Sequence, residues 1–133
     1  MRILLGICVL IVSCSENFTP VDMQKVAHGL QIYETHCANC HQLVGKGLAR
    51  IVPPLLNADY IVTNRNRLPA IVKYGMSEKI WVNGDHYQLK MPGNPQLTLD
   101  EITAIVNFVE FRYAKSTRLM PKDSVALLLN DTI

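Results

Sequence analysis

The chain has 133 residues, a length that suggests one domain. Its 13 Lys and Arg against 11 Asp and Glu give a formal charge of +2 at pH 7, and no long basic run appears. This balance implies neither a nucleic acid nor an anionic membrane surface as a partner.

The first thirteen residues are typical of a secretory signal peptide. Arg2 is followed by ten apolar residues, too few for a membrane span, which needs about 20. The segment ends Ile11-Val12-Ser13-Cys14, which resembles a bacterial lipobox, with cleavage before Cys14 and lipid attached to its sulfur. An ordinary signal cut nearby is the alternative. We therefore expect a lipoprotein-type signal peptide over 1–13, a tether over 14–21, and an exported protein, periplasmic or anchored to the membrane through Cys14 and facing the extracytoplasmic side.

Helical periodicity begins at Asp22, which we expect to be the N-cap. Apolar residues then recur at spacings of four and three, on one stripe: Val26, Leu30 and Tyr33. Gly29 lies in the same segment, where it costs about 1 kcal/mol relative to Ala. The close approach of another helix is one reason for a glycine here; a harmless surface position is the other.

This helix leads into Cys37-Ala38-Asn39-Cys40-His41, the pattern of a c-type haem attachment site. Two thiols three positions apart can form thioether bonds with the two porphyrin vinyl groups, and the next histidine is held under the iron. A structural zinc would need four ligands, and the other cysteines, Cys8 and Cys14, lie in the predicted targeting segment. A thioredoxin-like CxxC would follow a strand, and no strand pattern precedes Cys37. We expect one covalent haem c on Cys37 and Cys40.

The segment after His41 is predicted to be a loop, because it contains Gly45, Gly47 and the pair Pro53-Pro54. A haem histidine normally donates its other ring nitrogen to a carbonyl or carboxylate. Pro53 or a neighbour could supply that carbonyl. The alternative is that the proline pair only stiffens the loop.

The middle of the chain is predicted to hold a short helix at 57–62 and a second at 66–74, with Asn66 as N-cap and Gly75 as the stop. Residues 76–90 form a loop in which a turn at 83–84 pairs short strand-like arms. Trp81 and Tyr87 flank this turn. Either could donate a hydrogen bond to a haem propionate, although covering the edge of the core is the commoner role of such aromatics.

A helix is predicted from Thr98 onward, because Thr98 and Glu101 form a capping box. Its apolar stripe is at helical spacing: Ile102, Ile105, Val106, Val109 and Tyr113. Beyond residue 118 we expect a C-terminal tail, 119–133, whose apolar part could form a short helix packed on the body or on a partner.

A covalent haem requires a group on the other face of its iron. Met91 is favoured because it follows His41 by fifty residues, in a loop stiffened by proline and glycine just before the last strong helix. Met120 is the second choice, Met76 the third, and His86 would give bis-histidine ligation. His28 and His36 lie on the side that delivers the haem and are poorly placed.

Taken together, these features resemble those of the class I monohaem cytochromes c of bacteria. The resemblance spans residues 22 to about 114 and lies in Gly29-x-x-x-Tyr33-x-x-x-Cys37-x-x-Cys40-His41, Pro53-Pro54-Leu55, Met91-Pro92-Gly93 and the final helix. It implies an all-α domain over 22–118, with three to five helices wrapped around one covalently attached haem and the first and last helices crossing near Gly29. It also implies His41 as proximal ligand, Met91 as distal ligand, and the Pro53 carbonyl as the partner of His41.

With both axial positions filled, no open iron site remains for a substrate. We therefore expect a one-electron carrier with a redox protein as donor and another as acceptor, not an enzyme; the oligomeric state stays open. One rival is a peroxidase-like or gas-binding haem protein with a labile distal ligand. Another is a haem subunit docked on a dehydrogenase or oxidase through the tail.

Overall fold

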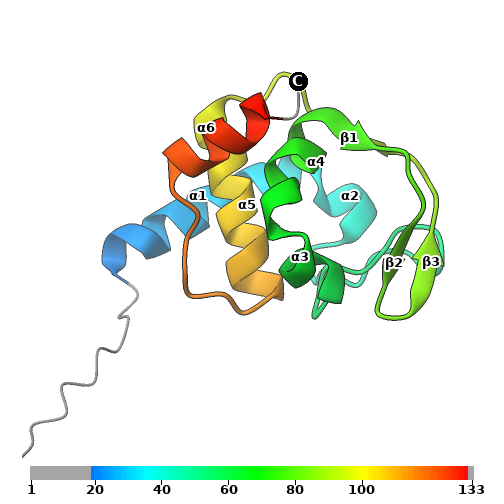
Figure 1. The fold of residues 1–133 in the computed structure, drawn as a ribbon. Coiled ribbons are helices and arrows are strands. Elements are labelled where there is room, and N and C mark those ends of the chain that lie inside the picture. Colours follow the sequence, from blue (N-terminus) through cyan, green and yellow to red (C-terminus); the bar gives the residue numbers. More distant parts are fainter. Residues whose placement is uncertain (1–18, 132–133) are drawn as a thin grey trace, which may run out of the picture.

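The computed structural model describes residues 19–131 (Figure 1). The predicted signal peptide, Cys14 and most of the predicted tether lie outside this range. The helices are α1 (Pro20–His36), α2 (Ala38–His41), α3 (Asp59–Thr63), α4 (Leu68–Tyr74), α5 (Leu99–Tyr113) and α6 (Lys122–Asn130), with a 3-10 turn at Arg65–Arg67. The strands are β1 (Gly75–Met76), β2 (Ile80–Val82), β3 (Asp85–Tyr87) and β4 (Met91–Pro92).

Helices α1 and α5 cross at Gly29 and form the centre of the core (Figure 1). A Cβ on Gly29 would collide with the Ala104 carbonyl and the Phe108 Cβ. Of the two explanations considered for this glycine, the close approach of another helix is therefore confirmed, as the resemblance implied. Around the crossing, Tyr33, Ile102 and Ile105 are at most 1% exposed.

Both long helices begin with a capping box. In α5, Thr98 is the N-cap and the Glu101 carboxylate accepts from the Thr98 backbone N–H, as predicted. In α1, however, the N-cap is Thr19, and Asp22 is the third helical residue of the box. The prediction of Asp22 as N-cap was wrong because the Thr19-Pro20 pair, assigned to the tether, already starts the helix.

The middle segment is built from short pieces. The expected helix at 66–74 begins two residues later, at Leu68, because Arg65–Arg67 forms a 3-10 turn and Asn66 makes no cap. Gly75 ends α4 with φ +77°, as predicted. A Cβ on Gly75 would collide with the Met91 carbonyl, so this glycine also permits β1 to lie against β4.

The four strands of the described range form two antiparallel pairs. Pair β2–β3 is the hairpin expected around residues 83–84, with Ile80 opposite Tyr87 and Trp81 opposite His86. Asn83 and Gly84 both have positive φ, as a two-residue hairpin turn requires. Pair β1–β4 joins segments far apart in the sequence, with Met76 directly opposite Met91.

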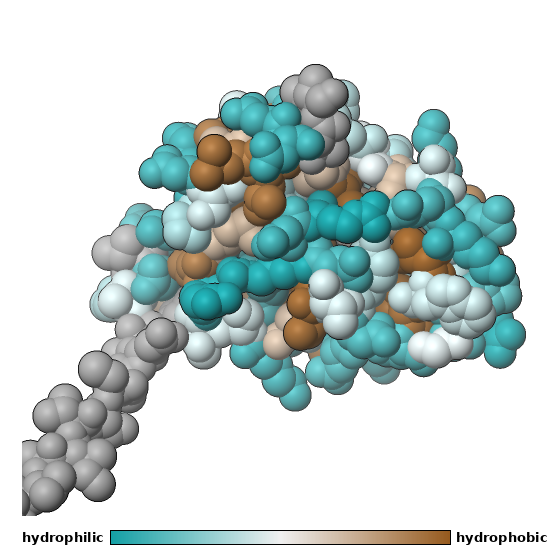
Figure 2. Space-filling view, viewed as in Figure 1, coloured by the Kyte–Doolittle hydropathy of each residue, from teal (hydrophilic) through white to brown (hydrophobic). Residues whose placement is uncertain are grey.

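The C-terminal segment is packed on the body as helix α6, which contacts α4 and α5. Val125 is fully buried and Met120 is 4% exposed. The buried Asn107 side chain holds Met120 by two hydrogen bonds, from its amide to the Met120 carbonyl (3.0 Å) and from the Met120 N–H to its oxygen (2.6 Å). Hydrophobic atoms are also visible on the outside of this helix, where Leu127 is 64% exposed (Figure 2).

The fold is mainly helical and agrees with the expected class, with two differences. The described part contains four short strands, and its six helices exceed the expected three to five because α2 and α3 are pieces of only 4 and 5 residues. Within residues 19–131 no helix is both long and apolar enough to cross a membrane.

Candidate haem site

A central cavity lies between α2, α4, α5 and the two strand pairs. It holds about 710 Å³ of space free of atoms, part of it open to solvent. Its walls are almost entirely apolar: Leu55, Ile61, Leu68, Ile71, Val72, Ile80, Val82, Ile105, Val106 and Val109 among others. A second hollow adjoins it and shares five lining residues: His41, Pro53, Met76, Ile80 and Met91.

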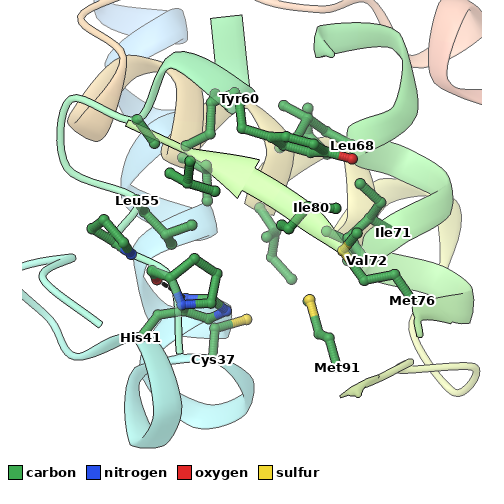
Figure 3. Close-up of a pocket in the computed structure, with 18 of the residues that line it drawn as sticks. Cys37, His41, Leu55, Tyr60, Leu68, Ile71, Val72, Met76, Ile80 and Met91 are labelled. Atoms are coloured by element: carbon green, nitrogen blue, oxygen red, sulfur yellow. Dashed lines mark hydrogen bonds between the residues drawn. The ribbon is translucent and has the colours of Figure 1, made fainter. Parts of the chain in front are cut away.

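His41 lies in the wall of both hollows, at the end of α2, and is 8% exposed. Its Nδ1 lies 3.2 Å from the Pro53 carbonyl oxygen, to which it can only donate (Figure 3). Burial lowers the pKa of the imidazole, and the bond to Pro53 opposes that shift. A neutral ring with Nδ1–H engaged leaves Nε2 as a lone-pair donor, which is what a metal requires.

The backbone after His41 is held by two buried tyrosines. The Tyr33 hydroxyl donates to the Gln42 carbonyl (2.8 Å), and the Tyr113 hydroxyl donates to the Leu43 carbonyl (2.9 Å). The two rings lie 5.7 Å apart within the α1–α5 core. The tyrosines thus connect the helix crossing to the loop that orients His41. Tyr33 and Tyr113 were expected only as core residues.

Cys37 and Cys40 lie at different parts of the site. Cys37 is half-buried in the central cavity, whereas Cys40 is exposed and lines the second hollow. Both are free thiols. Burial raises the pKa of the Cys37 thiol to about 11, with a further contribution from Cys40. The two sulfurs therefore flank the His41 side of the site, one on the inside and one at the surface.

Met91 lies across the cavity from His41 and points its sulfur into it (Figure 3). Met76 lies beside it and lines the same two hollows. The other predicted candidates are elsewhere: Met120 is buried against Asn107, and His86 is exposed beside the Trp81 ring. Neither Met120 nor His86 lines the two hollows.

Trp81 and Tyr87 point in different directions. Tyr87 is 7% exposed and lines the second hollow, but Trp81 is 60% exposed on the outer side of the hairpin, with the Lys79 ammonium 5.6 Å from its ring centre. The structure thus brings Tyr87 to the site and leaves Trp81 outside the cavity lining. The predicted contacts of both residues with a propionate stay predictions.

Sequence reasoning missed a polar group at the rim of the cavity. The Tyr60 ring lines the cavity, and its hydroxyl accepts from the Arg67 guanidinium (3.0 Å). Arg67 also forms an ion pair with Glu78. Burial raises the pKa of Tyr60, while Arg67 opposes the shift. No local sequence pattern predicts the contacts of these three residues, because they come from three segments that only the fold brings together.

The donor set fits an iron porphyrin. One imidazole nitrogen and one thioether sulfur face each other across a space with apolar walls, and two thiols flank the imidazole side. A flat ring bound in this space would lie between His41 and Met91, because the two side chains enter the cavity from opposite sides (Figure 3). Imidazole and thioether are known axial ligands of c-type haems.

Comparisons with known proteins agree with this geometry. The family model described as Cytochrome c matches residues 26–111. Two curated relatives, both named cytochrome c-552, come from Thermus thermophilus, one of them from a specified strain of that species, and each is 34% identical over 87 residues. The aligned region covers 62% of this chain and 66% and 58% of the two relatives, less than two thirds of either. The chain therefore belongs to the cytochrome c family, as a class I monohaem member whose cofactor is one covalently attached haem c.

Proposed function

We propose that this protein is a one-electron carrier, not an enzyme, whose haem is attached through Cys37 and Cys40 and ligated by His41 and Met91. The observation that carries the proposal is the placement of His41 and Met91 on opposite sides of one apolar cavity (Figure 3). The haem iron supplies the redox chemistry by cycling between its ferric and ferrous states. The protein supplies the rest: two attachment points, two axial donors and a dry pocket.

Each part of the site favours electron transfer over substrate chemistry. Filling both axial positions closes the iron to substrates. Thioether ligation and apolar walls favour the reduced form, so we expect a positive reduction potential. The Pro53 carbonyl and the two tyrosine hydroxyls fix the proximal side, which keeps the structural change between redox states small.

The exposed edge near Cys40 supports contact with redox partners. Cys40 lines the second hollow beside Ile51 and Leu89, which are 53% and 62% exposed. A donor or acceptor that docks there would approach the thioether edge of the porphyrin. Transient redox encounters use small interfaces, so a patch of this kind suffices.

We further propose that the protein works outside the cytoplasm, in an extracytoplasmic electron-transfer chain. The apolar segment 3–12 and the Ser13-Cys14 pair support export and lipid attachment at Cys14. Labelling of the expressed protein with a radioactive fatty acid, with Cys14→Ser as the matched control, tests the anchor. A label that persisted in the Cys14→Ser variant would contradict it.

Optical and NMR spectra of the purified protein test the proposed ligation. A pyridine haemochrome assay should report a c-type haem that acid acetone does not extract. The oxidised protein should show a sulfur-to-iron charge-transfer band in the far red, and the reduced protein should show the strongly shifted methyl resonance of one bound methionine. Met91→Ala should remove that resonance, and Met120→Leu should leave it in place. An unaltered resonance in Met91→Ala would exclude Met91 as the ligand.

A further inference from the structure

We propose that Met76 is a second distal thioether ligand, placed beside Met91, which binds the haem iron when Met91 does not. This inference rests on the proposed function, because it concerns the same iron. It adds a residue to the distal side and gives the pocket a means of keeping the iron six-coordinate.

The first argument is position. Among the described residues only five line both hollows, and three of them carry a donor atom suited to iron: His41, Met76 and Met91. His41 approaches from the α2 side, whereas both methionines come from the opposite side (Figure 3). The two methionine sulfurs therefore approach the same face of a ring that is bound between His41 and the methionines.

The second argument is backbone register. Met76 and Met91 are direct partners in the antiparallel pair β1–β4. Directly opposite residues project to the same face of a sheet, with Cβ atoms about 4.5–5.5 Å apart. A methionine side chain has three rotatable bonds, so either sulfur can cover that separation.

The third argument is that this part of the backbone is held in place. Asn94 N–H and the Asn94 side chain both donate to the Val72 carbonyl, at 3.1 and 3.3 Å. The Lys73 ammonium donates to the carbonyls of Pro95 and Leu97, each at 2.7 Å. These bonds tie the end of α4, and with it β1, to the segment that follows β4. Loss of the Met91 sulfur therefore need not displace Met76 from the cavity.

The other donors near the site are less suited. Lys90 and Glu78 line only the second hollow, and the Glu78 carboxylate is paired with Arg67. Lys90 is the neighbour of Met91, and successive side chains in an extended segment point to opposite sides. His86 lies on the outer face of the hairpin, next to Trp81.

The test compares Met91→Ala with the double variant Met76→Leu/Met91→Ala, both as proteins with attached haem. Met91→Ala should stay low-spin, with a shifted sulfur-to-iron band and one new shifted methyl resonance. The double variant should lose that band, become high-spin when oxidised, and bind carbon monoxide rapidly when reduced. If Met91→Ala fails to accumulate, Met91→Leu and its double variant with Met76→Leu serve for the same comparison.

Identical spectra of the single and double variants would overturn the proposal. So would a low-spin Met91→Ala protein without a sulfur band, because its ligand would then be a nitrogen donor. The single variant Met76→Leu separates this failure from that of the proposed function. In one outcome, the wild-type methyl resonance is lost in Met76→Leu but retained in Met91→Ala. Met76 would then be the ligand of the unmodified protein, and the assignment of Met91 would be refuted.

Discussion

At the scale of single residues, the two hydroxyls that hold the loop after His41 give the first prediction. Tyr33→Phe and Tyr113→Phe each remove one hydrogen bond to a backbone carbonyl without opening a cavity. Each change should lower the free energy of unfolding by about 1 kcal/mol, the usual net value of such a bond. Guanidinium titration of the haem-loaded protein, followed by circular dichroism, measures this quantity.

The matched control for these variants is Tyr74→Phe. Tyr74 is 49% exposed, and its hydroxyl makes no hydrogen bond within the described residues. Its replacement should change the unfolding free energy by less than about 0.5 kcal/mol. If Tyr33→Phe lowered the free energy of unfolding no more than Tyr74→Phe does, the hydroxyl of Tyr33 would not stabilise the loop.

Single residues also show where sequence reasoning succeeds. The contact of His41 with the Pro53 carbonyl could be predicted because its parts are close in the chain: Cys37, Cys40 and His41 belong to one five-residue motif, and Pro53 follows within one loop. The contacts of Tyr60, Arg67 and Glu78 could not be predicted. Their side chains meet through the packing of α3, the 3-10 turn and the segment before β2, which leaves no periodic signal in the sequence.

At the scale of elements, the crossing of α1 and α5 depends on the absence of a side chain at position 29. Gly29→Ala would place a Cβ against the Ala104 carbonyl and force the helices apart. Overpacking of this kind costs about 1–3 kcal/mol, which outweighs the gain in helix propensity of about 1 kcal/mol. Thermal unfolding should show a lower midpoint. Gln31→Ala, on the exposed side of α1, should leave the midpoint nearly unchanged.

The hairpin β2–β3 illustrates a signal that was present in the sequence but not used. A two-residue turn at 83–84 fixes the pairs 82–85, 81–86 and 80–87. Since side chains alternate along a strand, Trp81 and Tyr87 must then lie on opposite faces. We treated the two aromatic residues as equivalent because both flank the turn. That prediction did not use the alternation of side chains along the strands. By contrast, the pairing of β1 with β4 has no such local signal, and only the structure reveals Met76 beside Met91.

The segment that leads into α6 is held on the body by one buried amide, in addition to the packing of the buried Val125. Asn107 is 2% exposed and satisfies both the N–H and the carbonyl of Met120. Asn107→Leu would leave these two backbone groups without partners, at a cost of about 2–3 kcal/mol. Hydrogen exchange in residues 119–131 should therefore accelerate more than exchange in α1. Asn130→Ala, at the exposed end of α6, is the control and should change the exchange rate neither in residues 119–131 nor in α1. If residues 119–131 of Asn107→Leu exchanged as slowly as in the unmodified protein, the prediction would be contradicted.

At the scale of the whole molecule, the haem is expected to be a part of the core. The cavity walls come from α2, α4, α5 and both strand pairs, so almost every element of the fold meets at this space. Without the haem these apolar walls would face water, and burying one aliphatic side chain fully contributes about 1.5–3 kcal/mol. Total stabilities of such domains are about 5–15 kcal/mol.

Removal of the cofactor should therefore abolish cooperative folding. We predict that Cys37→Ser/Cys40→Ser, produced without haem attachment, has reduced helical circular dichroism and no sharp thermal transition. Protein whose porphyrin has been stripped of iron separates filling of the cavity from axial ligation. It should keep a cooperative transition at a lower midpoint, because the volume stays filled while the proposed bonds of the iron to His41 and Met91 are absent. If the haem-free variant unfolded at the same midpoint as the complete protein, the helices would pack without the porphyrin, and the cavity would be a preformed pocket instead of the centre of the core.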